Sequence, residues 1–188
     1  MSKAIGFSVF DTAIGHCGIA WTATAIAGTR LPETAVEDIQ RRYGEAKLSQ
    51  PPVFVHEAID RIRHLLTGEA DDLQSLPLDM ADITDLNRRV YAITRAIPPG
   101  KTRTYGDIAR ELGDPLFAQA VGQAMGRNPW PIIVPCHRVL ASGGKAGGFS
   151  APGGVDTKFR ILAIEQANIK QEGSLFEALP LAVKPRSE

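Results

Sequence analysis

The hydrophobic positions of the first thirty or so residues recur in short runs, which Gly, Thr and Asp interrupt. The segments "AIGFSVF", "GHCGIAWTATA" and "IAGTRLP" have this pattern. Short apolar runs separated by turn residues are typical of strands joined by tight connections. We therefore expect the chain to begin with a small antiparallel sheet.

Two segments after this sheet have helical patterns. Residues 34–44 begin with Thr34 and an acidic first turn and end at Gly44, which are signals for the two ends of a helix. Residues 53–68 end at Gly68 and repeat their apolar positions at helical spacing. These positions are Val55, Ile59, Ile62, Leu65 and Leu66. The acidic stretch that follows has no period, and we interpret it as the boundary between a front domain, residues 1–81, and a rear domain, residues 82–169.

The rear domain begins with helical patterns. Residues 82–100 repeat Leu86, Val90, Ile93 and Ile97 at helical spacing before a Pro-Pro-Gly stop. Residues 105–112 and 116–125 predict two short helices around a Gly-Asp-Pro turn, which is the helix-turn-helix pattern. The inward side chains of the second helix are expected to be Leu116, Ala120, Val121 and Ala124. Such a pair also arises from simple packing, so the pattern alone does not establish DNA binding.

The remainder of the chain contains a loop, a helix and a tail. The apolar run at residues 132–134 predicts a strand that leads to Cys136. Residues 142–156 are rich in glycine and predict a shaped loop, and residues 157–167 predict a last amphipathic helix. Residues 170–188 have no sustained period and are expected to form a partly loose tail. The fold class is thus an α+β front domain followed by a mainly helical domain.

Composition narrows the class of protein. The chain has 188 residues, of which 44% are hydrophobic and 22% charged, as in an ordinary globular protein. No apolar run approaches the ~20 residues of a membrane span, and the first residues lack the pattern of a secretory signal. Two cysteines are too few for a disulfide framework. We expect a protein of a reducing, cytoplasmic compartment that does not act at a membrane.

Charge is divided unevenly along the chain. Residues 1–85 hold 7 Lys and Arg against 13 Asp and Glu, whereas residues 86–188 hold 14 against 8. An acidic half joined to a basic half suggests that the second half faces a polyanion. Small domains also differ in charge by chance, and the counts alone favour that simpler explanation.

The sequence Cys136-His137-Arg138 carries the candidate chemistry. A thiol attacks as the thiolate, His137 can accept its proton directly or through a water, and Arg138 adds positive potential. An acidic residue is needed to orient the imidazole. The candidates are Asp156, Glu165, Glu172 and Glu177. Glu165 is the best placed, because the last helix must pack back on the rear domain. Neighbours on an extended chain point to opposite sides, so a bridging water is expected between Cys136 and His137.

Other interpretations of these residues remain open. Any single cysteine is most often a small buried hydrophobe, and Cys17 is interpreted in that way. His56 and His64 have no cysteine pattern around them, and no zinc or iron site is supported. Cys136 and His137 are also compatible with a thiol hydrolase, and the helix-turn-helix with a DNA-binding module that performs no chemistry.

Several motifs around Cys136 resemble one known family. "PCHRV" at residues 135–139 is the active-site signature of the O6-alkylguanine-DNA alkyltransferases. "IPPGKTRTYGDIA" and "AVGQAMGRNP" before it, and "GGFSAPGG" after it, are similar to the same family in the same order and spacing. The resemblance covers roughly residues 86–167, and the front domain more faintly.

The resemblance implies a fold and an activity. It implies a front domain of ribonuclease-H-like topology and a winged-helix-like helix-turn-helix domain. A family member flips an alkylated guanine out of double-stranded DNA and moves the alkyl group from O6 to the cysteine sulfur. The thioether is not turned over, so each molecule acts once, as a monomer and without a cofactor. A base within a duplex must leave the stack before such chemistry is possible.

The resemblance also implies roles for individual residues. Cys136 resembles the alkyl acceptor, His137 its water-linked base and Glu165 the orienting acid. Tyr105 resembles the tyrosine that donates a proton to the departing guanine, and Asn128 the asparagine that braces the turn before the cysteine. The residues that resemble substrate contacts are Val139, Phe149, Ser150 and Lys158. Those that resemble DNA contacts are Asn87, Gly106, Asp114, Arg127 and Ser142.

The sequence departs from the family pattern in two places. The family usually has an arginine nine residues before Asn128, which fills the gap left by the flipped base, and here that residue is Gln119. Glutamine can enter the stack but lacks the charge and planar guanidinium of arginine. We expect Gln119 to occupy the gap with weaker binding. Ala151 and Pro152 lengthen the loop after Ser150, which affects the outer wall of the pocket.

Overall fold

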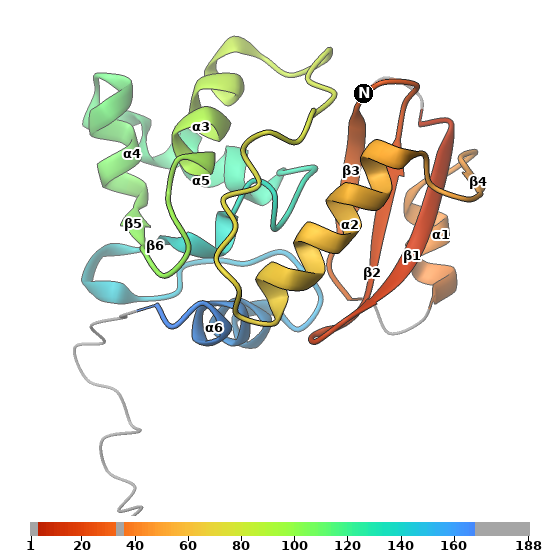
Figure 1. The fold of residues 1–188 in the computed structure, drawn as a ribbon. Helices are drawn as coiled ribbons and strands as arrows, with labels where there is room; N and C mark the ends of the chain where they lie inside the picture. Colours follow the sequence, from red (N-terminus) through yellow and green to blue (C-terminus); the bar gives the residue numbers. More distant parts are fainter. Residues whose placement is uncertain (1–3, 33–35, 168–188) are drawn as a thin grey trace, which may run out of the picture.

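The computed structural model describes residues 4–32 and 36–167, with a strand-rich part and a helical part side by side (Figure 1). The tail predicted at residues 170–188 lies outside the described residues. The architecture is α+β, with one mixed sheet and several helices. No helix within the described ranges is long and apolar enough to span a bilayer.

The predicted antiparallel sheet at the start of the chain is confirmed. Strands β1 (Gly6–Thr12), β2 (Gly15–Trp21) and β3 (Ile26–Arg30) pair in sequence order as antiparallel neighbours. The two-residue strand β4 (Lys47–Leu48) adds to β1 in parallel and gives the order β3-β2-β1-β4. A strand of two residues is too short to leave a hydrophobic period, so the sequence did not predict it.

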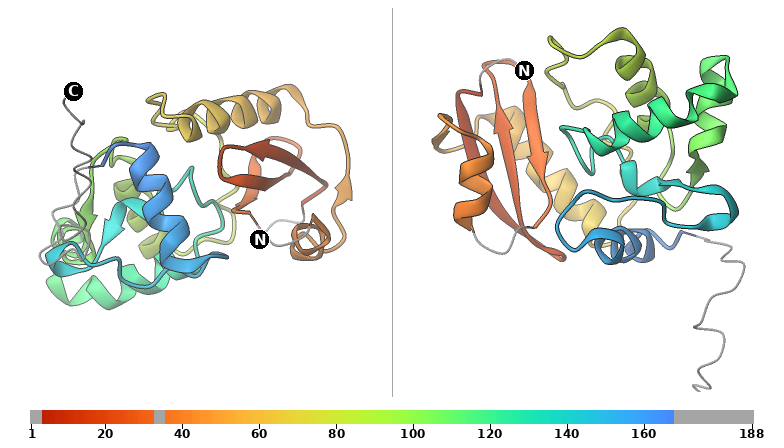
Figure 2. Two further views of the ribbon diagram at one scale, coloured as in Figure 1. Left: turned by 90° about the horizontal axis from the view of Figure 1, so that it is seen from below. Right: turned by 180° about the vertical axis from the view of Figure 1, so that it is seen from behind.

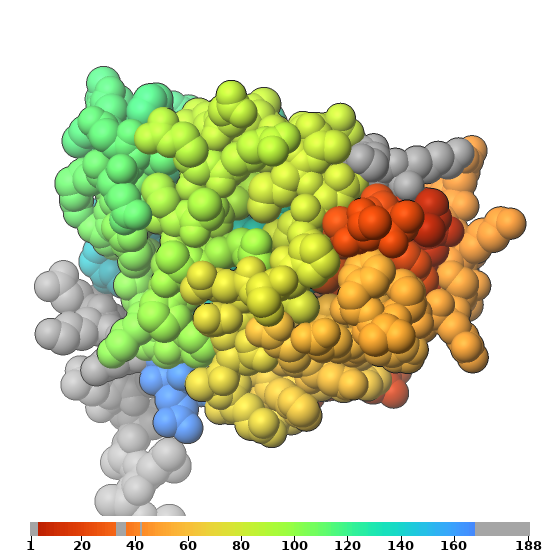
Figure 3. Space-filling view, turned by 45° about the horizontal axis from the view of Figure 1, so that its top comes forward, coloured from red at the N-terminus to blue at the C-terminus, as the bar shows by residue number. Residues whose placement is uncertain are grey.

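Two helices cover the faces of this sheet, as Figure 2 shows in its left view. Helix α1 (Val36–Arg42) lies on one face and α2 (Val53–Leu66) on the other. All five apolar positions predicted to form the inner face of α2 are buried. They join the larger of two apolar clusters, which continues into the helical part through Val90, Ile108 and Trp130. Residues 67–84 lie on the surface between the two parts (Figure 3, yellow to yellow-green).

Up to residue 167, where the described residues end, the helical part has four α-helices and one short pair of strands. The helices are α3 (Asp85–Arg95), α4 (Tyr105–Leu112), α5 (Ala118–Gly126) and α6 (Gly154–Ile164). Strands β5 (Arg103–Thr104) and β6 (Val139–Leu140) pair in parallel. The prediction for α4 is confirmed at both ends, because Thr104 and Asp107 form a capping box and Gly113 ends the helix at φ 108°.

The start of the second helix differs from the prediction. Residues Pro115–Phe117 form a 3-10 turn, capped by the Asp114 carboxylate that accepts from the Leu116 N–H, and α5 begins only at Ala118. Leu116 was predicted to point inward, and this was wrong: it is 85% exposed. The extra turn rotates Leu116 away from the apolar face, whereas Val121 and Ala124 are buried as expected.

The strand predicted before Cys136 is also wrong. Residues 131–134 form a turn in which the Val134 N–H donates to the Trp130 carbonyl at 2.8 Å, and Cys136–Arg138 form a 3-10 turn. Pro131 and Pro135 supply no N–H for a ladder, and Ile132 has φ 77°. The run is apolar because it is buried in the core, and not because it belongs to a sheet.

Candidate active site

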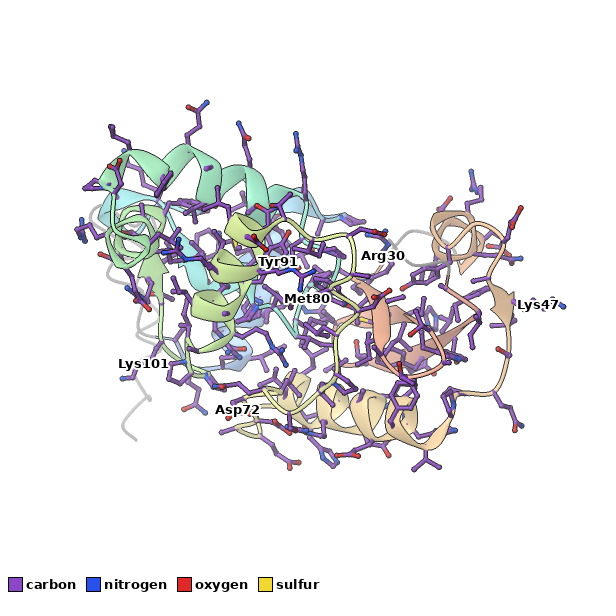
Figure 4. The ribbon with its side chains drawn as sticks, turned by 90° about the horizontal axis from the view of Figure 1, so that it is seen from above. Arg30, Lys47, Asp72, Met80, Tyr91 and Lys101 are labelled. Carbon is purple, nitrogen blue, oxygen red and sulfur yellow. The ribbon has the colours of Figure 1, made fainter. Side chains whose placement is uncertain are left out.

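A cavity of about 820 Å³ lies between the strand-rich part, helix α5 and the loop before α6. Cys136 lies in its wall together with Tyr105 and Asn128, and the loop contributes Phe149 and Ser150. Arg30 and Leu31, at the end of β3, form part of the wall as well. Figure 4 shows Arg30 at the junction of the two parts. No sequence pattern marks these two residues as part of the site, because they lie about a hundred positions before Cys136 in the chain.

The Cys136 thiol is almost enclosed, with only 7% of the residue exposed. Burial raises its pKa, whereas a hydrogen bond with the Asn128 side chain and the charge of Lys158 act in the opposite direction. Because the net direction is upward, the resting group is the thiol and not the thiolate. Attack on a substrate therefore requires a base.

The structure brings His137 and Glu165 together, as the sequence predicted. The His137 Nε2 lies 3.0 Å from Glu165 Oε1, and each side chain is 1% exposed. A carboxylate only accepts, so Nε2 carries the hydrogen and Nδ1 of the neutral ring keeps its lone pair. Burial lowers the pKa of His137, which favours this neutral form. His137 follows Cys136 in a 3-10 turn, so the argument from an extended chain does not apply.

Arg138 has a different contact from the one predicted. Its guanidinium donates to both oxygens of Glu165, with Nε–Oε2 at 3.0 Å and Nη2–Oε1 at 2.7 Å, and Nη1 donates to the Ile97 carbonyl at 2.6 Å. Its charge is thus directed to Glu165 and not to the thiol, which corrects the expectation that it supports Cys136. Burial opposes ionisation of Glu165, but the bonds from His137 and Arg138 outweigh it and lower the pKa to about 2. Asp156 is exposed, and Glu172 and Glu177 lie outside the described residues.

Asn128 spans the turn that precedes Cys136. Its Nδ2 donates to the Val134 carbonyl at 2.8 Å, and its Oδ1 accepts from the Trp130 N–H at 3.0 Å. One amide side chain therefore holds both ends of the turn. This is the contact that a bracing residue requires.

Lys158 connects the glycine-rich loop to the strand after Cys136. Its buried Nζ donates to the carbonyls of Val139 and Ala146, each at 2.6 Å, and lies 5.8 Å from the centre of the Phe149 ring. Burial lowers its pKa to about 8. The same loop is joined to α5 by the Ser150 hydroxyl, which donates to the Gly126 carbonyl at 3.1 Å.

Tyr105 lies at the first position of α4, with its hydroxyl 3.5 Å from the Gly148 carbonyl. That distance is at the limit for a hydrogen bond, so the hydroxyl is only weakly held. Burial raises the pKa of Tyr105, which keeps the phenol protonated at neutral pH. A weakly held, protonated phenol in the cavity wall is suited to donate to a bound base.

The expected DNA contacts are dispersed over the helical part. Gln119 and Arg127 are exposed on and just after α5, and only Arg127 also lines the cavity. Asn87 and Gly106 lie in the first turns of α3 and α4. Ser142 is exposed in a 3-10 turn of the loop. Asp114 has a structural contact, because its carboxylate accepts from the Leu116 N–H at 2.8 Å.

Within the described ranges there is no group of three or more potential metal ligands.

Comparisons with known proteins find similar sequences in one family. Residues 85–167 match the family model described as 6-O-methylguanine DNA methyltransferase, DNA binding domain. A methylated-DNA–protein-cysteine methyltransferase from Mycobacterium tuberculosis is 32% identical over 173 residues, which cover 92% of this chain and 99% of the relative. One from Methanothermobacter thermautotrophicus is 37% identical over 122 residues, 65% of this chain and 67% of the relative.

Solved structures of similar proteins have the same fold. The structure of Mycobacterium tuberculosis OGT in complex with DNA has a TM-score of 0.71 and 33% identity, with 86% of this chain and 93% of that chain covered. The O6-methylguanine-DNA methyltransferase of Pyrococcus kodakaraensis has a TM-score of 0.64 and 28% identity, with 85% and 98% covered. By its sequence, its fold and the motifs around Cys136, the chain belongs to the methylated-DNA–protein-cysteine methyltransferase family.

Proposed function

We propose that this protein repairs DNA by direct reversal: it flips O6-alkylguanine out of the duplex and transfers the alkyl group to Cys136. The observation that carries the proposal is the placement of the Cys136 thiol in the wall of a cavity, followed directly by the buried His137–Glu165 pair. A soft sulfur nucleophile beside a neutral imidazole is suited to displace an aryl ether oxygen from an alkyl carbon.

The chemistry needs one base and one acid. His137 Nδ1 takes the proton of the Cys136 thiol through a water, while Glu165 stabilises the imidazolium that forms. The thiolate attacks the alkyl carbon, so that the S–C bond forms as the C–O bond breaks, and the electron pair leaves with O6 of guanine. Tyr105 donates a proton to the departing base, and this proton is replaced from the imidazolium. The products are unmodified guanine and a thioether, and each molecule acts once, without a cofactor.

The other predicted substrate contacts lie at the edge of the same cavity. Ser150 and Phe149 lie on its loop side, where a hydroxyl close to O6 and an aromatic wall would hold the flipped base. Asn128 braces the turn, and main-chain groups of Cys136 and Val139 meet the base edge. Lys158 fixes the loop from behind and favours the thiolate.

The DNA-binding surface of this proposal is the helix-turn-helix formed by α4 and α5. Helix α5 lies behind α3 in Figure 1 and comes to the front in the right view of Figure 2. Gln119 enters the gap left by the flipped base, and Arg127 binds the backbone near the cavity. Further backbone contacts come from Asn87, Gly106, Asp114 and Ser142. The excess of basic residues after position 85 supports binding that weakens with salt.

We also propose a topology for each of the two domains. The front domain, residues 1–81, has a ribonuclease-H-like topology, and the rear domain, residues 82–169, is a winged-helix-like helix-turn-helix unit. The protein acts as a monomer in the cytoplasm, where a reducing environment keeps its cysteines free. Cys17 and Cys136 are both unpaired, which supports this setting.

One experiment tests the proposal against its alternatives. The protein is incubated with a duplex that contains O6-methylguanine, and its intact mass is measured. The expected result is a gain of one methyl group, located on Cys136 and absent in Cys136→Ala. Binding of the duplex with unchanged protein mass and unchanged DNA would favour a lesion-binding module without alkyl transfer. Continued product release beyond one equivalent would favour a hydrolase.

A further inference from the structure

The turn that leads to Cys136 is bonded to an edge strand of the front sheet. The Thr29 N–H donates to the Pro129 carbonyl at 2.9 Å, and the Thr29 hydroxyl donates to the Pro131 carbonyl at 2.7 Å. The Trp130 indole Nε1 donates to the Ile26 carbonyl at 2.8 Å. Residues about a hundred positions apart are thus joined by three hydrogen bonds, and β3 gains a partner on its free side.

The contact between β3 and the turn is close. A Cβ added at Gly28 would lie 3.1 Å from the Pro129 carbonyl oxygen, nearer than most real Cβ contacts. Thr29 is 1% exposed and Trp130 is fully buried. In this buried contact, a carbonyl that lost its donor would cost about 1–3 kcal/mol. The hydrogen bonds of Thr29 are therefore a strong constraint on the turn.

The turn itself holds a backbone conformation that its sequence does not favour. Ile132 has φ 77°, in the left-handed region, which is a rare conformation for a β-branched residue. Such a conformation costs on the order of 1–3 kcal/mol and persists only where the surroundings determine it. Two bonds enclose Ile132: Thr29 holds the Pro131 carbonyl before it, and Asn128 holds the Val134 carbonyl after it.

The strained turn continues directly into the reacting residue. The Cys136 N–H donates to the Val134 carbonyl at 2.8 Å, the same oxygen that Asn128 Nδ2 contacts. A shift of the turn must therefore move Cys136. For an attack that needs the sulfur aligned with the C–O bond, a displacement of about 1 Å can cost on the order of a hundredfold in rate.

We propose that Thr29 is a positioning residue for alkyl transfer, whose hydroxyl locks the strained turn at residues 129–134 and thereby sets the position of the Cys136 sulfur. This inference rests on the proposed function, because its effect is measured as the rate of alkyl transfer. Thr29 does not touch the substrate. It acts from the front domain, through the Pro131 carbonyl, on a nucleophile in the rear domain.

The test compares two replacements of Thr29 with a matched control. Thr29→Val removes the hydroxyl at nearly constant volume, and Thr29→Ser keeps it. Thr94→Val is the control, because Thr94 is fully buried and its hydroxyl donates to the Val90 carbonyl in its own helix at 2.8 Å. Single-turnover transfer from O6-methylguanine duplex at saturating DNA, the Kd for the duplex and the rate of Cys136 labelling by iodoacetamide are measured for each.

The expected results distinguish a change in the position of Cys136 from a general loss of stability. Thr29→Val should transfer about tenfold more slowly while its Kd for the duplex stays within about twofold of the original, because no DNA contact is lost. Its Cys136 should be labelled faster, since a looser turn exposes the thiol. Thr29→Ser should retain the original rates, and Thr94→Val should lose stability without loss of transfer rate. Labelling is located at Cys136 by peptide mass, so that Cys17 does not interfere.

The outcomes distinguish this inference from the proposed function. If the unaltered protein transfers the methyl group and Thr29→Val does so at the same rate, or loses no more than Thr94→Val, the positioning role is wrong and the function stands. If the unaltered protein transfers nothing, the proposed function fails, and the labelling rates still test whether Thr29 holds Cys136. If Thr29→Val does not fold, Gly28→Ala replaces it in the test. This variant keeps the Thr29 hydroxyl, but its added methyl group displaces the Pro129 carbonyl, so it too should slow transfer.

Discussion

The buried side of the site and the exposed face of helix α5 are built in opposite ways. Behind Cys136, the side chains of His137, Arg138 and Glu165 are each 1% exposed, and they are joined by hydrogen bonds of 2.6–3.2 Å to one another and to the Ile97 carbonyl. Helix α5, in contrast, has no charged residue, and Gln119 extends from it into solvent. In the proposed function, the chemistry thus depends on a few fixed contacts, whereas recognition by α5 depends on contacts formed only with DNA.

The largest loss of stability and of transfer should come from Glu165→Gln, which removes the buried carboxylate that binds both His137 and Arg138. Removal of one member of a buried ion pair leaves the charge of Arg138 uncompensated and costs about 3–5 kcal/mol in the free energy of unfolding. Transfer should be lost as well, because the amide no longer stabilises the His137 imidazolium. Denaturant unfolding and single-turnover transfer measure the two effects.

Glu111→Gln is the matched control for this change. Glu111 pairs with Arg103 near the surface, and its side chain is 48% exposed. Exposed pairs contribute about 0–1 kcal/mol, so this variant should unfold almost as the original does. Equal losses in the two variants would contradict the distinction between a buried and an exposed carboxylate.

Tyr105→Phe should slow alkyl transfer and leave the free energy of unfolding almost unchanged. The phenol has only a 3.5 Å contact with the Gly148 carbonyl, so its loss should change the free energy of unfolding by less than about 0.5 kcal/mol. The rate of transfer should fall by about a hundredfold, as expected for loss of a general acid.

Tyr91→Phe should have the reverse effect. The Tyr91 hydroxyl donates to the Ala124 carbonyl at 3.1 Å in the core, so the variant should lose about 1 kcal/mol of stability and keep its transfer rate. Were Tyr91→Phe to slow transfer as much as Tyr105→Phe, the acid role of Tyr105 would be wrong.

Acid should lower the free energy of unfolding through the buried residues Glu165 and His137, whereas α5 has no charged residue that would respond to pH. The pKa of Glu165 is about 2 in the folded protein against an ordinary 4.5, so the stability that this carboxylate contributes is present above pH 4.5 and is lost as the pH falls towards 2. His137 acts in the same direction, because its lowered pKa leaves the folded state unprotonated while the unfolded chain takes up a proton below 6.5. Denaturant unfolding between about pH 7 and pH 3 should show this loss, and a smaller one in Glu165→Gln.

The smallest effect should come from Gln119→Arg on the exposed side. A guanidinium adds charge and a planar stacking surface, so the duplex should be bound more tightly and the salt dependence of binding should steepen by up to about 0.9 in the log–log slope. Stability should not change, because Gln119 is exposed. No gain in duplex binding or in repair rate would count against a role for Gln119 in the gap left by the flipped base.

The parts of the structure that sequence predicted are those fixed by local pattern. The sheet, the inner face of α2 and both ends of α4 follow from periodicity and caps. Glu165 could be selected because the last amphipathic helix had to pack against the same domain as Cys136. For each of these, the deciding information lies within a few turns of the chain.

The parts that sequence missed depend on distant partners. The run Ile132–Val134 is apolar like a strand, but it lies in a turn, and Thr29 and Ile26 bind the residues just before it, Pro131 and Trp130. Arg138 was expected to act on the nearest thiol, and its planar fork instead fits the carboxylate of Glu165. Arg30 lies at the cavity because the pairing of β3 in the sheet brings the end of that strand there. Hydrophobic period and local motifs carry no information on such contacts.

The enclosure of Cys136 has a consequence for how long the protein survives in the cell. Oxidation to sulfenic acid requires an accessible thiolate, and Cys136 is 7% exposed with a raised pKa, so we expect peroxides to react with it slowly. A protein that is consumed by a single reaction has no second thiol in its active site to replace Cys136. We therefore expect the same burial that makes a base necessary for repair to protect each molecule from oxidative inactivation until it meets its lesion.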